Sequence, residues 1–157
     1  MTVRSFRNCN PGNLRTGQPW IGLCPPDQMT PEQVEETQFC VFIRPDYGFR
    51  ALGMTLLTYF RAYKLQTVNS IISRWAPANE NDTRAYVLAV SKALNVQPTD
   101  TINVADQVTL SNLCKAIAVH EAGGWIFDNA DLQNGVDMAL GIIPMPIPPN
   151  DTGPIAA

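Results

Sequence analysis

The chain has 157 residues, of which 45% are hydrophobic and 16% charged, and its formal net charge is −3. This length favours one compact domain whose core needs no disulfide or metal for support. The apolar content argues against wholesale disorder, and the low pI of about 5.0 argues against a protein that binds nucleic acid through a basic face.

Turn-forming residues dominate the first 25 positions, so we expect an ordered loop there with one short strand near Leu14 or Trp20. The run 30–33 (TPEQ) has the spacing of a capping box with proline at the first helical position, which predicts a short helical turn. The run 39–43 (FCVFI) is typical of a β-strand in a small sheet or ribbon.

From residue 46 onward the apolar side chains recur at helical spacing. Proline, glycine and short polar residues mark where each segment begins or ends. Helices are predicted at about 46–63, at 67–75, from 83 to about 94, from 105 or 109 to 121, and at 131–140. The sequence therefore predicts a mainly α (α+β) fold, with a small β element.

Two segments indicate whether the chain spans a membrane or carries a secretory signal. The longest uncharged apolar segment, 138–149, contains four prolines, so no membrane-spanning helix fits there. The N-terminus has no apolar core of a secretory signal, so we expect synthesis in a cytoplasm. We divide the chain into a domain at 1–141 and a proline-rich, extended tail at 142–157.

The four cysteines form no CxxC pair, and the single histidine, His120, is not close in sequence to two of them. We therefore expect no metal site and no cofactor, and cysteines that act as small core residues. A Cys24–Cys40 disulfide stays open if the protein reaches an oxidising compartment.

Glu121 is the strongest candidate for chemistry. One face of the fourth predicted helix carries Leu110, Leu113, Cys114, Ile117 and Glu121. Lys115 and His120 fall on other faces. Partial burial and the negative end of the helix dipole both disfavour a charged carboxylate, which suits a general acid. The alternative is that Glu121 rotates into solvent in the last turn of the helix.

Two loops offer further polar groups. The run 8–13 carries amides and backbone donors, although by itself it is more typical of an Asx/proline turn without a ligand. The run 75–83 places carboxamides and carboxylates beside Trp75, and it fits a calcium loop poorly. Trp20, Trp75 and Trp125 all neighbour glycine or proline in predicted loops, where indoles can stack on sugar rings or act as lids.

Five motifs occur in one order: RNCNPGNLR at 7–15, the strand from 39 leading to PDYGFRAL at 45–52, TVNSIISRWAP at 67–77, ENDT at 80–83 and AIAVHEAG at 116–123. Together they resemble a family of bacteriophage and prophage virion proteins related to lytic transglycosylases, with a lysozyme-like domain. The resemblance covers residues 4 to 141.

In soluble lytic transglycosylases the catalytic glutamate ends an early helix, and a motif with a Glu-Thr and a Tyr-Val pair follows it. Here the segment similar to the first motif, 117–123, comes after the segment similar to the second, 80–87. The resemblance therefore implies a circularly permuted lysozyme-like fold.

The resemblance implies that Glu121 is the acid/base and that Tyr86 is the tyrosine whose hydroxyl contacts it. It also implies that Asn10, Gly12 and Asn13 line a glycan groove, with Glu80 and Thr83 as supporting residues, and we add Trp75 as a substrate-binding candidate because its indole could stack on a sugar ring. The chain departs from the pattern at two positions, since Ala122 stands where relatives tend to have asparagine or serine, and Cys9 where they tend to have asparagine.

The activity that this implies is cleavage of the MurNAc–GlcNAc β-1,4 bonds of peptidoglycan by a lytic transglycosylase. A hydrolase would need a second carboxylate, for which Glu80 and Asp82 are candidates. The expected partners are peptidoglycan strands and other phage virion proteins. We expect synthesis in the host cytoplasm, assembly into a virion, and action in the bacterial periplasm or cell wall. The alternatives are an inactive virion structural protein, motivated by the tail, and a secreted bacterial effector.

Overall fold

A computed structural model describes residues 2–79 and 82–144. The helices are α1 (Arg4–Arg7), α2 (Pro31–Val34), α3 (Pro45–Arg61), α4 (Val68–Trp75), α5 (Thr83–Leu94), α6 (Gln107–Ala122) and α7 (Asn129–Ala139), with a 3₁₀ turn, η1, at Pro26–Gln28. The prediction of a mainly helical chain is confirmed.

Helix starts follow the local capping signals of the sequence. In five helices the side-chain oxygen of the N-cap residue accepts a hydrogen bond from a backbone N–H in the first turn. These N-cap residues are Thr30, Thr67, Asp82, Asp106 and Asp128. Helix ends are equally local, because α5 and α6 stop at residues in the left-handed conformation, Asn95 and Gly123. These signals explain why each long helix lies within a few residues of its predicted range.

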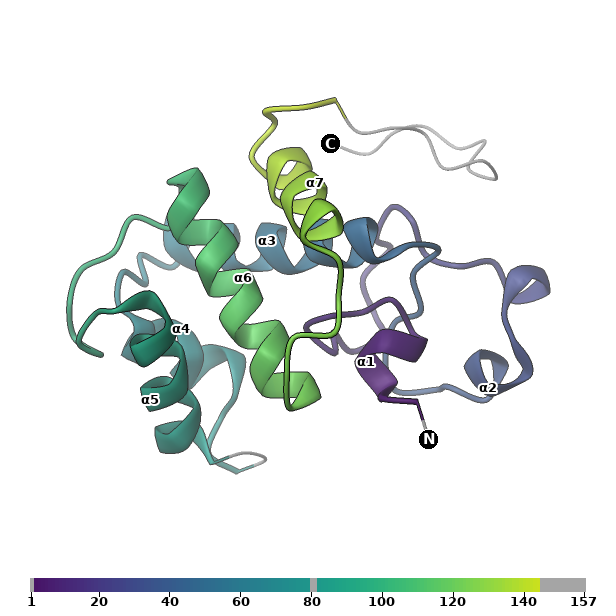
Figure 1. Cartoon of the computed structure of the whole chain (residues 1–157), viewed down its shortest axis with the longest axis horizontal. Helices are drawn as coiled ribbons and strands as arrows, with labels where there is room; N and C mark the ends of the chain where they lie inside the picture. The colour runs from purple at the N-terminus through teal and green to yellow at the C-terminus, as the bar shows by residue number, and fades with distance from the viewer. Residues whose placement is uncertain (1, 80–81, 145–157) are drawn as a thin grey trace.

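Helix α6 lies across α3, with α5 packed on one side of it and α7 on the other (Figure 1). Its predicted apolar face is fully buried, with no exposed surface on Leu110, Leu113, Cys114 or Ile117. Burying each large aliphatic side chain contributes about 1.5–3 kcal/mol. The core therefore fixes the rotation of α6 about its axis, and with it the direction of Glu121.

The predicted strand at 39–43 does not form. Its backbone pairs with two loops in turn, since the N–H of Cys40 donates to Leu14 O whereas the N–H of Ile43 donates to Gly22 O. Two isolated antiparallel bridges result, Arg15↔Phe39 and Leu23↔Phe42. Because the 39–43 run pairs with one loop and then with the other, neither loop runs beside it for long enough to form a β-ladder. The run nevertheless buries Cys40 and Phe42 in a small second core beside Tyr47.

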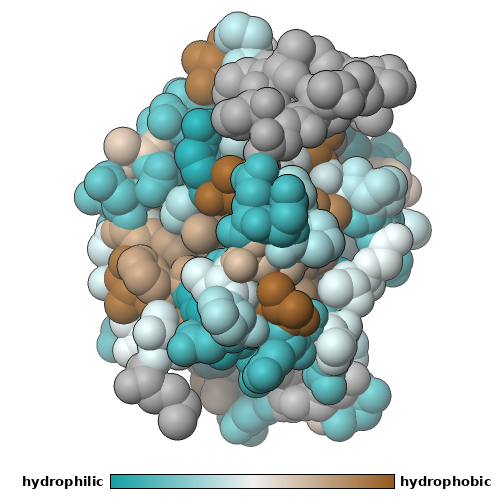
Figure 2. Space-filling model, turned by 90° about the vertical axis from the view of Figure 1, so that its right-hand side faces the viewer, coloured by the Kyte–Doolittle hydropathy of each residue, from teal (hydrophilic) through white to brown (hydrophobic). Residues whose placement is uncertain are grey.

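The N-terminal turn α1 was not predicted, because its N-cap, Val3, supplies no side-chain acceptor. The tail boundary at residue 142 stays a prediction, since residues 145–157 lie outside the described part of the chain. The face seen in Figure 2 is mostly hydrophilic, with apolar side chains in separate small areas. None of the helices within residues 2–79 and 82–144 is long and apolar enough to cross a bilayer.

The four cysteines are free thiols, and Cys40 and Cys114 are buried, as expected of small core residues. The Cys24–Cys40 disulfide is not formed in this structure. Burial raises the pKa of the Cys9 thiol to about 11, and the neighbouring Cys24 thiol and two carboxylates act in the same direction.

Alkylation of Cys9 should therefore be slow in the folded protein. Only the thiolate reacts, and a pKa raised from 9.0 to about 11 lowers the thiolate fraction about 100-fold at neutral pH. We expect native iodoacetamide labelling, followed by peptide mapping, to modify Cys9 only as the pH approaches 11. Rapid labelling of Cys9 at pH 8 would show that the loop carrying it opens.

Gly48 allows the 9–11 loop to lie directly on α3. A Cβ at this position would overlap the carbonyl oxygen of Cys9 and lie 2.7 Å from Cδ of Pro11. We expect Gly48→Ala to lower the free energy of unfolding by about 1–3 kcal/mol, despite the helix propensity of alanine. Gly124→Ala is the control, because a Cβ there meets no atom within 4 Å. Equal unfolding free energies in urea for the two variants would contradict the close approach.

Candidate active site

Glu121 lies in the last turn of α6 and is half-buried. Its side chain faces a cavity of about 350 Å³ instead of rotating into solvent. The cavity wall comes from α1, the 12–15 loop, residue 39, α3, α4 and α6, and comprises Arg4, Gly12, Asn13, Leu14, Arg15, Phe39, Thr55, Tyr59, Trp75, Ala76 and Glu121. The helix thus presents one carboxylate to a cleft built from distant parts of the chain.

Both oxygens of Glu121 accept a hydrogen bond. The amide nitrogen of Asn13 donates to Oε1 at 3.2 Å, and the hydroxyl of Tyr86 donates to Oε2 at 3.0 Å. A carboxylate offers about four acceptor positions, so each oxygen keeps one for a ligand. The carboxyl group is therefore held in one orientation while it stays available to the cavity.

Tyr86 is oriented by a second hydrogen bond. The indole N–H of Trp75 can only donate, and it lies 3.2 Å from the Tyr86 oxygen. The hydroxyl therefore accepts from Trp75 and gives its own hydrogen to Glu121. Burial, reinforced by the charge of Glu121, raises the pKa of Tyr86 above its usual range. Tyr86 hence stays a neutral donor that positions the carboxyl.

His120 packs against the ring face of Tyr86. Its ring stacks on Tyr86 with centroids 3.7 Å apart and an interplanar angle of 27°. His120 lies on another face of α6 than Glu121, as the helical spacing predicts. Its imidazole is exposed but packs on Tyr86, the residue that donates to Glu121. Lys115, in contrast, lies over the Trp125 ring at 4.8 Å.

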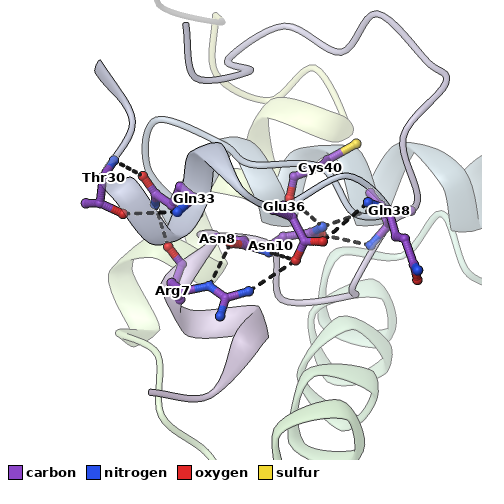
Figure 3. Close-up of polar contacts among 9 residues, drawn as sticks. Arg7, Asn8, Asn10, Thr30, Gln33, Glu36, Gln38 and Cys40 are labelled. Carbon is purple, nitrogen blue, oxygen red and sulfur yellow. Dashed lines mark hydrogen bonds and ion pairs between the residues drawn. The ribbon is translucent and has the colours of Figure 1, made fainter. Parts of the chain in front are cut away.

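Asn10 holds the loop that carries Asn13. Its amide nitrogen donates to Leu14 O and Cys40 O, both at 3.0 Å, and its Oδ1 accepts from the Leu14 N–H at 2.9 Å. Figure 3 shows this amide beside a second contact, in which Asn8 donates to Glu36. Asn10 is fully buried. The structure therefore corrects its expected place on the groove wall and puts it beneath the loop.

The remaining predicted residues divide into two groups. Gly12 and Trp75 line the cavity together, and a Cβ on Gly12 would lie 3.2 Å from the indole, so any larger residue there would require the ring to shift. Thr83 does not line the cavity; its hydroxyl donates to Ala76 O and ties the start of α5 to the end of α4. Glu80 lies outside the described residues.

Several cavity residues were missed as site residues by sequence reasoning, namely Arg4, Phe39, Thr55 and Tyr59. They come from three segments that are distant in sequence, since Arg4 is on α1 and both Thr55 and Tyr59 are on α3, while Phe39 was predicted only as part of a strand. Among the described residues, Glu121 is the carboxylate that lines the cavity. Asp82, the other described candidate, does not line it; it is exposed and caps α5 by accepting a hydrogen bond from the Ala85 N–H. Those residues also contain no cluster of His, Cys, Asp or Glu able to hold a metal ion.

The chain is 33% identical over 105 residues to Protein P5 of Pseudoalteromonas phage PM2. The match covers 64% of this chain and 61% of that protein, so the chain spans less than two thirds of its relative's length. No family model matches the sequence. The chain is therefore similar to a phage protein.

The backbone at Asn13 gives a direct test of how the loop is held. Its φ of 47° lies in the left-handed region, where alanine costs about 1–2 kcal/mol and glycine does not. Both Asn13→Ala and Asn13→Gly remove the donor to Glu121, so the difference between them reports the backbone alone. We expect the Ala variant to unfold in urea with about 1 kcal/mol less free energy than the Gly variant. Equal values would mean that residue 13 leaves this conformation.

Proposed function

We propose that the protein is a lytic transglycosylase that cleaves the β-1,4 bond between N-acetylmuramic acid and N-acetylglucosamine in peptidoglycan. One observation carries the proposal: a single glutamate, held by an amide and a phenol, faces an open cavity lined by Trp75, Tyr59 and Asn13. Aromatic side chains and amides are suited to sugar rings and their hydroxyl and acetamido groups.

In the first step the protonated Glu121 donates its proton to the glycosidic oxygen, and the bond from that oxygen to C1 breaks. The resulting oxocarbenium-like sugar is attacked at C1 by its own C6 hydroxyl oxygen. Glu121, now a carboxylate, accepts the C6 hydroxyl proton, so the 1,6-anhydro product leaves an enzyme in its starting form. Tyr86 and Asn13 keep the carboxyl in place through both steps.

Among the described residues the cavity presents the carboxylate of Glu121, and this route needs no second one. A glycoside hydrolase places two carboxyl groups roughly 5–9.5 Å apart across the bond. Of the two earlier candidates, Asp82 is used as the N-cap of α5, and Glu80 is not among the described residues. Since the sugar supplies the nucleophile in a transglycosylase, Glu121 suffices.

We further propose a lysozyme-like domain in permuted order. Its support is that the tyrosine helix, α5, precedes the glutamate helix, α6, while Tyr86 and Glu121 still meet at 3.0 Å. The tyrosine–glutamate contact implied by the family resemblance is present here. The similarity to a phage protein agrees with a role in a virion, from which the protein would act on the bacterial cell wall.

The alternative function is an inactive virion structural protein with the same fold. It is favoured by the phage relative and by Ala122, which follows the proposed catalytic residue where related enzymes tend to carry a polar side chain. Under this alternative the site would bind glycan weakly or not at all.

Incubation of the purified protein with peptidoglycan distinguishes the two. We expect soluble fragments ending in 1,6-anhydro-N-acetylmuramic acid, and a loss of about 10³-fold or more in rate for Glu121→Gln, because the amide can neither donate nor accept the transferred proton. Asp27→Asn, which neutralises an exposed carboxylate in η1 away from the cavity, is the control and should keep full activity. Reducing-end products would indicate hydrolysis. No cleavage, or equal cleavage by Glu121→Gln, would support the structural alternative.

A further inference from the structure

Arg50 is a buried arginine for which residues 2–79 and 82–144 supply no anionic partner. It belongs to the N-terminal half of α3 and exposes 6% of its surface. Its Nε atom is buried and makes no hydrogen bond. Burial lowers the pKa of the guanidinium below its usual value, because a cation loses hydration in such a place. A buried cation is normally paired with an anion, so a partner for Arg50 is to be expected.

The acid one turn before Arg50 is engaged elsewhere. Both carboxylate oxygens of Asp46 accept hydrogen bonds from the Arg44 side chain, and one of them also accepts from the N–H of Tyr47. Within the described ranges, the phenol of Tyr47 acts electrostatically on the pKa of Arg50, and no carboxylate does so. The anion for Arg50 therefore has to come from outside those ranges.

Two acidic residues lie outside them, Glu80 and Asp151. Glu80 belongs to the connection that follows Trp75. Leu52 and Trp75 both lie against the N-terminal loop. Since successive residues of a helix are about 100° apart around its axis, Arg50 is on nearly the opposite face of α3 from Leu52. That face is turned away from the segment that carries Glu80, so Asp151 is the better candidate.

Helix α7 brings the start of the tail close to Arg50. The two helices meet where a Cβ on Gly135 would lie 2.8 Å from the backbone nitrogen of Arg50. One turn later, a Cβ on Gly53 would lie 3.0 Å from the Cβ of Ala139. Helix α7 therefore passes Arg50 first and ends shortly beyond it.

The chain turns immediately after α7. Gly141 has a left-handed φ of 72°, and the N–H groups of Ile142 and Ile143 both donate to Asp137 O. A helix end of this kind, with a left-handed glycine and backbone donors bonded to the last turn, takes the chain off the helix axis. The tail is therefore not led straight on past the end of α3.

The tail is long enough to return to Arg50. Extended proline-rich chain rises about 3.1 Å per residue, so the stretch from Pro144 to Asp151 can span about 20 Å. Gly135, the α7 residue beside Arg50, lies only about 9 Å along the helix before Gly141. Asp151 is the charged residue of the segment 145–157, which is otherwise rich in proline and apolar side chains.

We propose that the segment 145–157 binds the α3–α7 surface of its own chain, with the carboxylate of Asp151 accepting a hydrogen bond from Nε of Arg50. The pair neutralises the buried guanidinium and ties the end of α7 to the start of α3. Prolines restrict the backbone before binding, so an extended segment loses little conformational freedom when it is held. This inference does not depend on the proposed function.

Urea unfolding of single and double variants tests the pair. Asp151→Asn should lower the unfolding midpoint by about 0.5–1 M, because it leaves a buried guanidinium without an anion. Arg50→Met replaces the charge by an apolar side chain of similar length, and in that background Asp151→Asn should have no further effect. The control is Asp27→Asn, the same change at an exposed carboxylate of η1, and it should leave the midpoint unchanged. An equal effect of Asp151→Asn in both backgrounds, or no effect in either, would overturn the inference.

The Nε–H resonance of Arg50, assigned through its own backbone, gives a second measurement that does not need the Arg50→Met protein to fold. Asp151→Asn should shift this resonance and speed its exchange with water about tenfold or more, whereas Asp27→Asn should do neither. An unchanged resonance would contradict the pairing.

The dependence on protein concentration distinguishes the two possible sources of Asp151. A tail bound to its own chain predicts a midpoint that is independent of concentration, and sedimentation as a monomer. A midpoint that rises with concentration, and no longer does so in Asp151→Asn, would assign the tail to a neighbouring copy and overturn the intramolecular contact.

Discussion

The site depends on a pair of hydrogen bonds that hold one carboxyl group from two sides. Tyr86 and Asn13, which donate to Glu121, lie 35 and 108 residues away from it in sequence. The Tyr86 contact forms only when α5 packs beside α6, and the Asn13 contact forms only when the N-terminal loop reaches the end of α6. The geometry of Glu121 is therefore a property of the whole fold, and the proposed acid/base chemistry follows from it.

The two donors are supported by different physics. Tyr86 is positioned by burial, by the indole N–H of Trp75 and by the stacked ring of His120. Asn13 is positioned by backbone geometry, since it takes a left-handed conformation and the loop beneath it is tied down by Asn10. One side thus resembles a packed core and the other a strained, hydrogen-bonded loop. Trp75 joins them, because it binds Tyr86 and also rests on Gly12.

A structural feature could be predicted from the sequence when the residues that determine it lie close together along the chain. The long helices and the buried stripe of α6 could be predicted because capping residues and helical periodicity are written within a few positions of each other. The strand at 39–43 could not be excluded, because its failure depends on two separate loops competing for its backbone groups. Asn10 carries no local signal that separates a buried anchor from a ligand contact. The burial of Arg50 arises only through tertiary structure.

A double-mutant cycle on the unfolding free energy tests the contact between Tyr86 and Glu121 most directly. The Tyr86→Phe and Glu121→Ala proteins and the combined variant are compared with the parent in urea, because alanine at position 121 leaves no acceptor for the phenol. If the phenol donates to the carboxylate, the two changes are coupled by about 1–3 kcal/mol, as expected for a hydrogen bond to a charged group. Free energies that add to within about 0.5 kcal/mol would mean that the two side chains do not interact, and that Glu121 is not held for chemistry.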